Sequence, residues 1–153
     1  MGANATNAEI VTLDVVETLK TDGEIVTSLD TTEVVTTTNV ITAAESGKTF
    51  ILNSTSPFVS TLPTAATGLR YRFYAGASQV TGGNHTVVCT NNDNTIYGSV
   101  TVAGVVVAGT VEGSINFVAD TMLPGDGVEV FNDGTNWYVS GQATASGAIT
   151  LTT

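Results

Sequence analysis

From Asn39 onward, turn-forming residues interrupt the sequence about every ten residues, and short segments rich in threonine and valine lie between the turns. β-branched residues are restricted about χ1 and pack well on a pleated surface, so such segments favour strands. Threonine and valine account for 28 and 21 of the 153 residues. The chain is therefore predicted to be almost entirely β.

The alternating segments predict ten strands, over residues 39–43, 49–53, 58–62, 71–75, 86–90, 99–107, 115–119, 128–132, 137–140 and 148–152. Asp133-Gly134 between two of them is a strong hairpin signal. Short strands at this spacing are typical of a sandwich or a barrel, and nothing supplies the long crossover helices of an α/β fold. We therefore expect an all-β fold, a jelly-roll-like antiparallel β-sandwich, over residues 39–153.

The first 38 residues differ from the rest. Eight of the 14 acidic residues fall within the first 45 positions, together with one lysine. No clean helical period holds there, although a short helix over residues 11–20 stays open. We predict that residues 1–38 form an extended, acidic N-terminal arm with one or two short strands.

The charge balance excludes several partners. A net charge of −10 with only four Lys and Arg cannot form the basic stripe that phosphate contacts require, so we expect no nucleic acid and no anionic membrane surface as partner. The longest apolar stretch, residues 100–111, is too short to span a bilayer. Charged residues make up only 12% of the chain, about half the usual share, which favours a surface partly covered by another subunit.

The motifs that resemble chemical sites are better interpreted as structure. Gly47-Lys48-Thr49 matches the end of a P-loop, but Thr42 stands where the first glycine belongs and a strand follows. We expect a turn with a solvated lysine.

The single His85 and single Cys89 lie about 13 Å apart along one strand, too far to chelate one metal. A buried cysteine and a histidine at the edge of a loop are expected. Residues 91–94 predict a turn rather than a calcium loop. We predict no catalytic, cofactor-binding or metal-binding residue, no cofactor, and no enzymatic activity.

One predicted strand offers a candidate interface. Alternation places Arg70, Arg72 and Tyr74 on one face, with Tyr71 and Phe73 on the other. Exposed Arg and Tyr are typical of interface hot spots, and half of the cations of the chain lie here. Our hypothesis is that both arginines bind acidic groups of a neighbouring subunit or of another partner protein; local pairing is an equally open alternative.

Trp137 and Tyr138 point to opposite faces of one strand. We include Trp137 as the fourth candidate interface residue. Together with Tyr97, it is also a candidate for the exposed aromatic platform that a glycan-binding module would need.

Two segments, residues 41–76 and residues 95–143 with their closing DGTNWYVSG, resemble small structural proteins of tailed bacteriophages, including head decoration (cement) proteins and fibre-associated proteins. They cover a little over half of the chain. The resemblance implies a homotrimeric β-domain that is made in the bacterial host cytoplasm and resides on the capsid exterior, bound to the major capsid protein. The alternative is a tail-fibre or receptor- or glycan-binding module of the virion.

Overall fold

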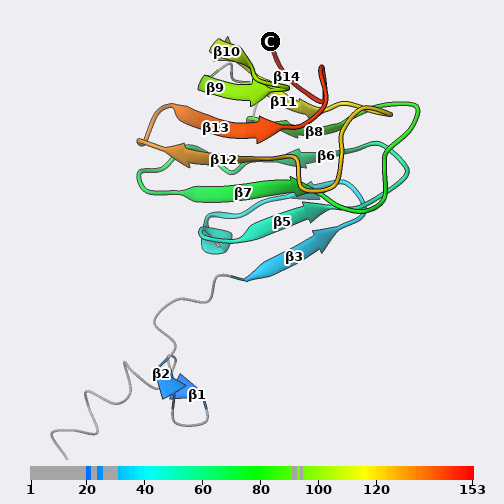
Figure 1. The fold of residues 1–153 in the computed structure, drawn as a ribbon. Helices are drawn as coiled ribbons and strands as arrows, with labels where there is room; N and C mark the ends of the chain where they lie inside the picture. The colour runs from blue at the N-terminus through cyan, green and yellow to red at the C-terminus, as the bar shows by residue number, and fades with distance from the viewer. Residues whose placement is uncertain (1–19, 22–23, 26–30, 91–92, 94) are drawn as a thin grey trace, which may run out of the picture.

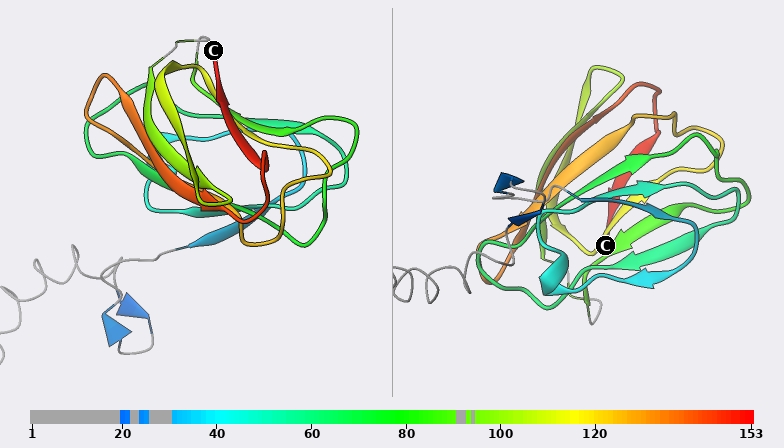
Figure 2. Two further views of the ribbon diagram at one scale, coloured as in Figure 1. Left: turned by 45° about the horizontal axis from the view of Figure 1, so that its top comes forward. Right: turned by 90° about the horizontal axis from the view of Figure 1, so that it is seen from below.

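The computed structural model describes residues 20–21, 24–25, 31–90, 93 and 95–153. Within these residues, two β-sheets pack face to face, and the helical geometry is 3₁₀ only, at residues 43–45 and at Thr90 (Figures 1 and 2). The elements are β1 (Lys20–Thr21), β2 (Glu24–Ile25), β3 (Thr32–Val35), β4 (Asn39–Val40), η2 (Ala43–Glu45), β5 (Thr49–Leu52), β6 (Phe58–Thr61), β7 (Arg70–Ala75), β8 (His85–Val88), β9 (Ile96–Val102), β10 (Val105–Glu112), β11 (Ser114–Phe117), β12 (Gly127–Asn132), β13 (Trp137–Ala143) and β14 (Ile149–Thr152).

The larger sheet has seven strands in the order β10-β9-β13-β12-β7-β5-β3, and the smaller has five in the order β14-β11-β8-β6-β4. Strands β1 and β2 form a separate antiparallel pair. The all-β sandwich is thus confirmed. The antiparallel prediction is wrong, because both sheets are mixed: β3 with β5, β5 with β7, β4 with β6, β6 with β8, and β9 with β13 run parallel.

The parallel pairs have a physical cause in the path of the chain. Successive strands from β3 to β8 alternate between the two sheets, so every second strand returns to the same sheet in the same direction. The intervening strand serves as the crossover connection that parallel neighbours need. The structure does not show a jelly roll, whose strands are antiparallel.

Most predicted strands coincide with observed ones to within a few residues. The exception is the predicted strand over residues 99–107, which is two strands, β9 and β10, joined by a tight turn. Ala103 and Gly104 form that turn with φ of 49° and 81°. Positive φ at both central residues is the geometry that joins antiparallel strands in a two-residue hairpin.

The core lies between the sheets and is aromatic at its centre. Its largest fully buried side chains are Trp137, Tyr71, Phe50, Phe73, Phe117, Ile41, Leu52, Leu62, Ile96, Ile115, Met122 and Ile149. Phe50 stacks on Phe73 with 5.4 Å between the ring centroids, and Tyr71 lies 5.9 Å from Trp137. Pairs of this kind contribute roughly 0.5–1.5 kcal/mol beyond their buried area.

Part of the predicted arm belongs to the sandwich. Strand β3 pairs in parallel with β5 at the edge of the larger sheet, and Val35 is buried. The structure therefore includes residues 32–35 in the sandwich that was predicted to begin at Asn39. Most of residues 1–30 lie outside the described residues. Among the described residues, no helix is long and apolar enough to cross a membrane.

Candidate functional site

The candidate site is the outer face of the larger sheet, the side turned away from the smaller sheet. Paired residues lie side by side across neighbouring strands, and residues two apart on one strand are about 7 Å apart, so the side chains form rows. The aromatic row consists of Arg70, Phe131, Tyr138 and Tyr97. The charged row consists of Arg72, Glu129, Ser140 and Ser99. The third row consists of Tyr74, Gly127, Gln142 and Thr101.

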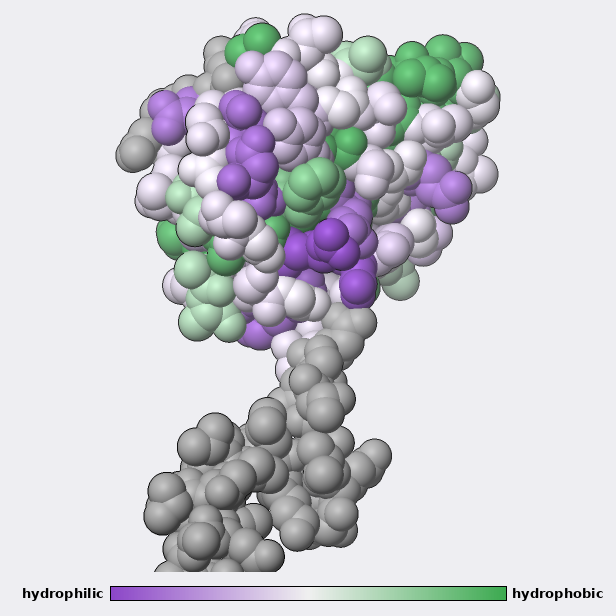
Figure 3. Space-filling model, turned by 90° about the vertical axis from the view of Figure 1, so that its left-hand side faces the viewer, coloured by the Kyte–Doolittle hydropathy of each residue, from purple (hydrophilic) through white to green (hydrophobic). Residues whose placement is uncertain are grey.

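The aromatic row is continuous across four strands. The Arg70 guanidinium lies 5.9 Å from the Phe131 ring centroid, Phe131 stacks on Tyr138 at 5.0 Å, and Tyr138 lies 6.3 Å from Tyr97. The Tyr138 hydroxyl donates a hydrogen bond of 2.9 Å to Asp133, and this bond raises the pKa of Tyr138. Figure 3 faces the end of the sandwich where β12 turns into β13, and strongly hydrophilic side chains lie there beside weakly polar and hydrophobic ones.

Glu129 joins the first two rows. Its carboxylate lies 3.5 Å from Arg70 Nε and accepts a hydrogen bond of 3.3 Å from Arg72 Nε. The local pairing of the arginines, left open by the sequence, is therefore present in the structure. Arg70 and Arg72 therefore share the Glu129 carboxylate on this face of the sheet.

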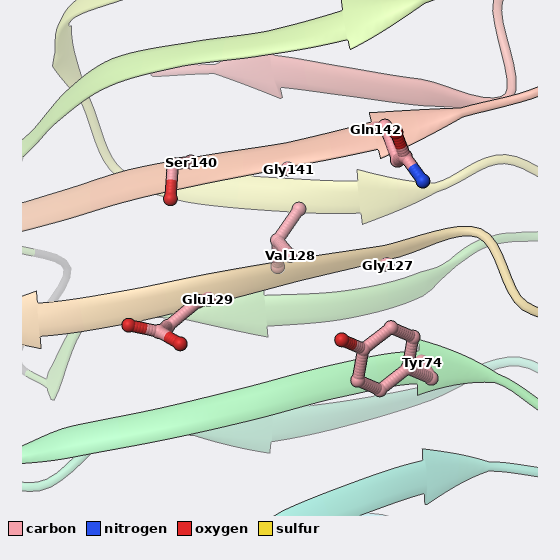
Figure 4. A pocket seen from close by; sticks show the side chains of 7 residues that line it. All are labelled: Tyr74, Gly127, Val128, Glu129, Ser140, Gly141 and Gln142. Atoms are coloured by element: carbon pink, nitrogen blue, oxygen red, sulfur yellow. The ribbon is translucent and has the colours of Figure 1, made fainter.

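A shallow groove of about 370 Å³ opens on the third row (Figure 4). Its lining consists of Tyr74, Gly127, Val128, Glu129, Ser140, Gly141 and Gln142. The absence of a side chain at Gly127 lets the Tyr74 ring lie at the edge of this groove, because a Cβ there would lie 2.2 Å from Cδ1 of the ring. The tyrosine ring occupies that space and covers the glycine, an arrangement that protects exposed strand glycines.

The polar groups around the groove are free to bind. Within the described part of the chain, no hydrogen-bond partner is found for the Tyr74 hydroxyl, for Ser140 Oγ or for the Gln142 amide. Tyr74 is 37% exposed, and Ser140 and Gln142 are exposed. The groove therefore offers one aromatic ring together with donors and acceptors in solvent.

The structure brings three of the four candidate interface residues together. Arg70, Arg72 and Tyr74 share the outer face as predicted. Trp137 does not, because its side chain is only 1% exposed and packs against Tyr71 in the core. Because Trp137 points from β13 into the core, it is not available to an interface on the outer face.

Sequence reasoning missed Glu129 and Phe131, although the alternation of GVEVFN places both opposite the buried Val128 and Val130. It also missed the groove, because the closeness of Gly127 to β7 is not visible in the sequence.

The motifs set aside on sequence are structural elements here. Lys48 follows a turn, and its Nζ lies 2.7 Å from Glu33 and 2.9 Å from Glu45. Cys89 is buried as expected. Residues 91, 92 and 94 of the predicted turn lie outside the described residues.

His85 is fully buried inside the sandwich rather than placed at the edge of a loop. Its ring lies 4.1 Å from the Phe58 ring centroid, and Nε2 is 3.1 Å from the Ser54 carbonyl oxygen. Nδ1 is buried without a partner among the described residues, and burial lowers the pKa of His85. The same residues contain no group of three or more His, Cys, Asp or Glu that could hold a metal ion.

Comparison of the chain with known protein families, with curated proteins and with solved structures found no match. The outer face is therefore interpreted from its own chemistry. It combines a stacked aromatic row, an arginine–glutamate cluster and a polar groove with a tyrosine ring.

Proposed function

We propose that this chain is a structural protein of a tailed-bacteriophage virion, which decorates the capsid exterior as a homotrimer and stabilises it by added contact with the major capsid protein. The resemblance of residues 41–76 and 95–143 to such proteins supports the proposal. The observation that carries it is a pair of exposed patches on different elements of the sandwich, one uncharged and one apolar, because a ring of identical subunits joins two different surfaces.

The first patch is the outer side of the smaller sheet, whose five strands contain no Asp, Glu, Lys or Arg. Val40 and Val59 are 71% and 37% exposed there. Polar side chains on this side bond mainly to one another: Thr86 donates to Asn116 at 3.1 Å, and Asn116 donates to Thr152 at 3.0 Å. A surface that lacks charge and already satisfies its own hydrogen bonds loses little on being covered.

The second patch lies on β10, an edge strand of the larger sheet. Val105 and Val106 are both 66% exposed, and Val111 is 46% exposed. Exposed apolar edge strands are uncommon in monomers because they pair with other chains. Contact between β10 of one subunit and the smaller sheet of the next would cover both patches in a closed ring.

Oligomeric state tests this assembly. Light scattering of the full chain is expected to give a mass near three times 15.6 kDa. Val106→Lys places a charge in the β10 patch and is expected to shift the protein to monomers. Val34→Lys is the matched control: Val34 is 58% exposed on β3, at the opposite edge of the same sheet, and its replacement is expected to leave the trimer intact. A wild-type monomer at high concentration contradicts the assembly.

The location of the protein on the virion is tested by labelling intact particles with an antibody against this chain. Decoration predicts signal distributed over the head. Signal confined to the tail fibres contradicts decoration and supports the second candidate function.

That second candidate is a receptor- or glycan-binding module of a tail fibre. The observation that favours it is the aromatic surface of the larger sheet, where Phe131 is 43% exposed and Tyr74 is 37% exposed. Of the two platform residues proposed from sequence, Tyr97 lies on this surface, whereas Trp137 is buried.

A further inference from the structure

We propose that the groove on the third row binds a hexopyranose residue of a glycan, with the Tyr74 ring as its stacking platform. The inference rests on the second candidate function and deepens it by assigning the ligand class and the residues.

The orientation of Tyr74 leaves one face of its ring open to a ligand. The ring lies where the side chain of residue 127 would stand, with Cδ1 and Cε1 only 2.2 Å and 2.6 Å from the position of an added Cβ. Seen from outside the sheet, the ring is broadly face-on (Figure 4). One face therefore covers the glycine backbone and the other faces solvent. An open aromatic face attracts the weakly positive C–H groups on the apolar side of a pyranose ring.

The rim of the groove supplies polar groups that can bind sugar hydroxyls. Glu129, Ser140 and Gln142 line the groove on β12 and β13, on one side of the Tyr74 ring, and they supply a carboxylate, a hydroxyl and an amide (Figure 4). Glu129 accepts a hydrogen bond from Arg72, and an ionised carboxylate has about four acceptor sites. Sugar hydroxyls both donate and accept, so these polar groups beside one aromatic face match the polar edge of a pyranose.

Size and charge argue against other ligand classes. The volume of about 370 Å³ is at the lower end of the range of about 300–1,000 Å³ for small-molecule pockets. No cation lines the groove, so a phosphate would have no direct partner. Apart from Tyr74, Val128 is the only apolar side chain in the lining, and it is 2% exposed, which leaves little for an entirely apolar ligand.

The aromatic row is a poorer platform than Tyr74. Phe131 and Tyr138 are stacked with an interplanar angle of 22° and 5.0 Å between centroids, so part of each ring covers the other. The Arg70 guanidinium lies 5.9 Å from the Phe131 centroid. The faces of these rings are thus partly covered by neighbouring side chains, whereas no aromatic neighbour is found for Tyr74 among the described residues.

The test is titration of the full ¹⁵N-labelled chain with methyl α-D-glucopyranoside, methyl β-D-galactopyranoside and methyl α-D-mannopyranoside, followed by NMR. At least one pyranoside is expected to shift the amide signals of Gly127, Gly141 and Gln142 saturably, with a Kd of order 1–10 mM, as suits a shallow site with one platform. Absence of saturable shifts at these amides up to about 100 mM for all three sugars overturns the proposal.

Variants separate the groove from its surroundings. Tyr74→Ala is expected to weaken binding about tenfold or more, and Gln142→Ala by a few-fold. Tyr74→Phe keeps the platform and is expected to retain binding to within about threefold, which guards against a folding artefact of the alanine variant. Tyr97→Ala is the control, an aromatic truncation on the same face but outside the groove, and is expected to bind as the wild type does.

Binding that is lost in Tyr97→Ala but kept in Tyr74→Ala refutes the groove and moves the site to the aromatic row. Absence of pyranoside shifts combined with antibody signal on the fibres refutes the groove while the fibre function stands. Signal over the head combined with pyranoside binding refutes the fibre location while the groove stands.

Discussion

The contact between Gly127 and Tyr74 predicts that one added methyl group destabilises the protein and that removing the ring relieves most of the damage. In Gly127→Ala the new Cβ would lie 2.2 Å from Cδ1 and 2.6 Å from Cε1 of the Tyr74 ring, and 2.8 Å from the Phe73 carbonyl oxygen. Overpacking of this kind costs about 1–3 kcal/mol, and two ring contacts plus a backbone contact place the expected loss near 2 kcal/mol.

The Tyr74→Ala background removes both ring contacts and keeps the contact with the Phe73 carbonyl oxygen, so Gly127→Ala is expected to cost about 1 kcal/mol there. The double-mutant cycle therefore predicts a coupling of about 1 kcal/mol between the two positions. Urea denaturation followed by fluorescence of Trp137, the single tryptophan, measures all four free energies of unfolding.

The control cycle pairs Gly127→Ala with Tyr97→Ala, which lies in another row, and is expected to be additive within about 0.5 kcal/mol. Equal additivity in the Tyr74 cycle would refute the claim that the ring covers the glycine, and with it the open platform of the groove.

Three further predictions concern the sandwich. Trp137→Ala is expected to cost about 3–5 kcal/mol by urea denaturation followed by circular dichroism because the ring is buried, whereas Tyr138→Ala, on the outer face, is expected to cost about 1 kcal/mol; equal costs would contradict the finding that Trp137 faces the core and Tyr138 faces outward. Burial lowers the pKa of His85 below 6.5, so the unfolded chain binds a proton more readily, and stability is expected to fall as the pH drops below 6.5, by at most about 1.4 kcal/mol per pH unit. His85→Phe is expected to flatten the stability profile between about pH 7 and 5, and an unchanged profile would assign the dependence to other groups. A chain that begins at Thr31 is expected to melt cooperatively near the wild-type temperature, whereas one that begins at Asn39 loses β3 and is expected to melt several degrees lower by circular dichroism; equal melting would show that β3 adds no stability.

The positions of the strands were predictable because their signals are local. Alternation with a period of two put Ile115 and Phe117 on one buried face, as the structure confirms. The partners of the strands were not predictable, because pairing joins distant segments. Alternation of successive strands from β3 to β8 between the sheets, which accounts for four of the five parallel pairings, leaves no mark in a single strand. The hairpin at Ala103-Gly104 was missed because valines continue on both sides of it.

Part of the candidate site was likewise predictable from local sequence, and part depends on contacts between distant segments. The common face of Arg70, Arg72 and Tyr74 follows from their spacing on one strand. The carboxylate that joins the two arginines comes from Glu129, which is 57 residues away from Arg72 along the chain. The choice of Trp137 over Tyr138 failed because both side chains tolerate burial, and only the packing of β13 decides which of them faces the core.

Under the proposed function a tailed phage encodes this chain, and the most direct test is the binding of the purified chain to heads of that phage prepared without this protein. Co-sedimentation, quantified against the major capsid protein, is expected to saturate at three copies per binding site and to increase the resistance of the heads to heat. Absence of saturable binding, or saturation at one copy per site without added resistance, would contradict the account of this chain as a trimeric capsid decoration protein.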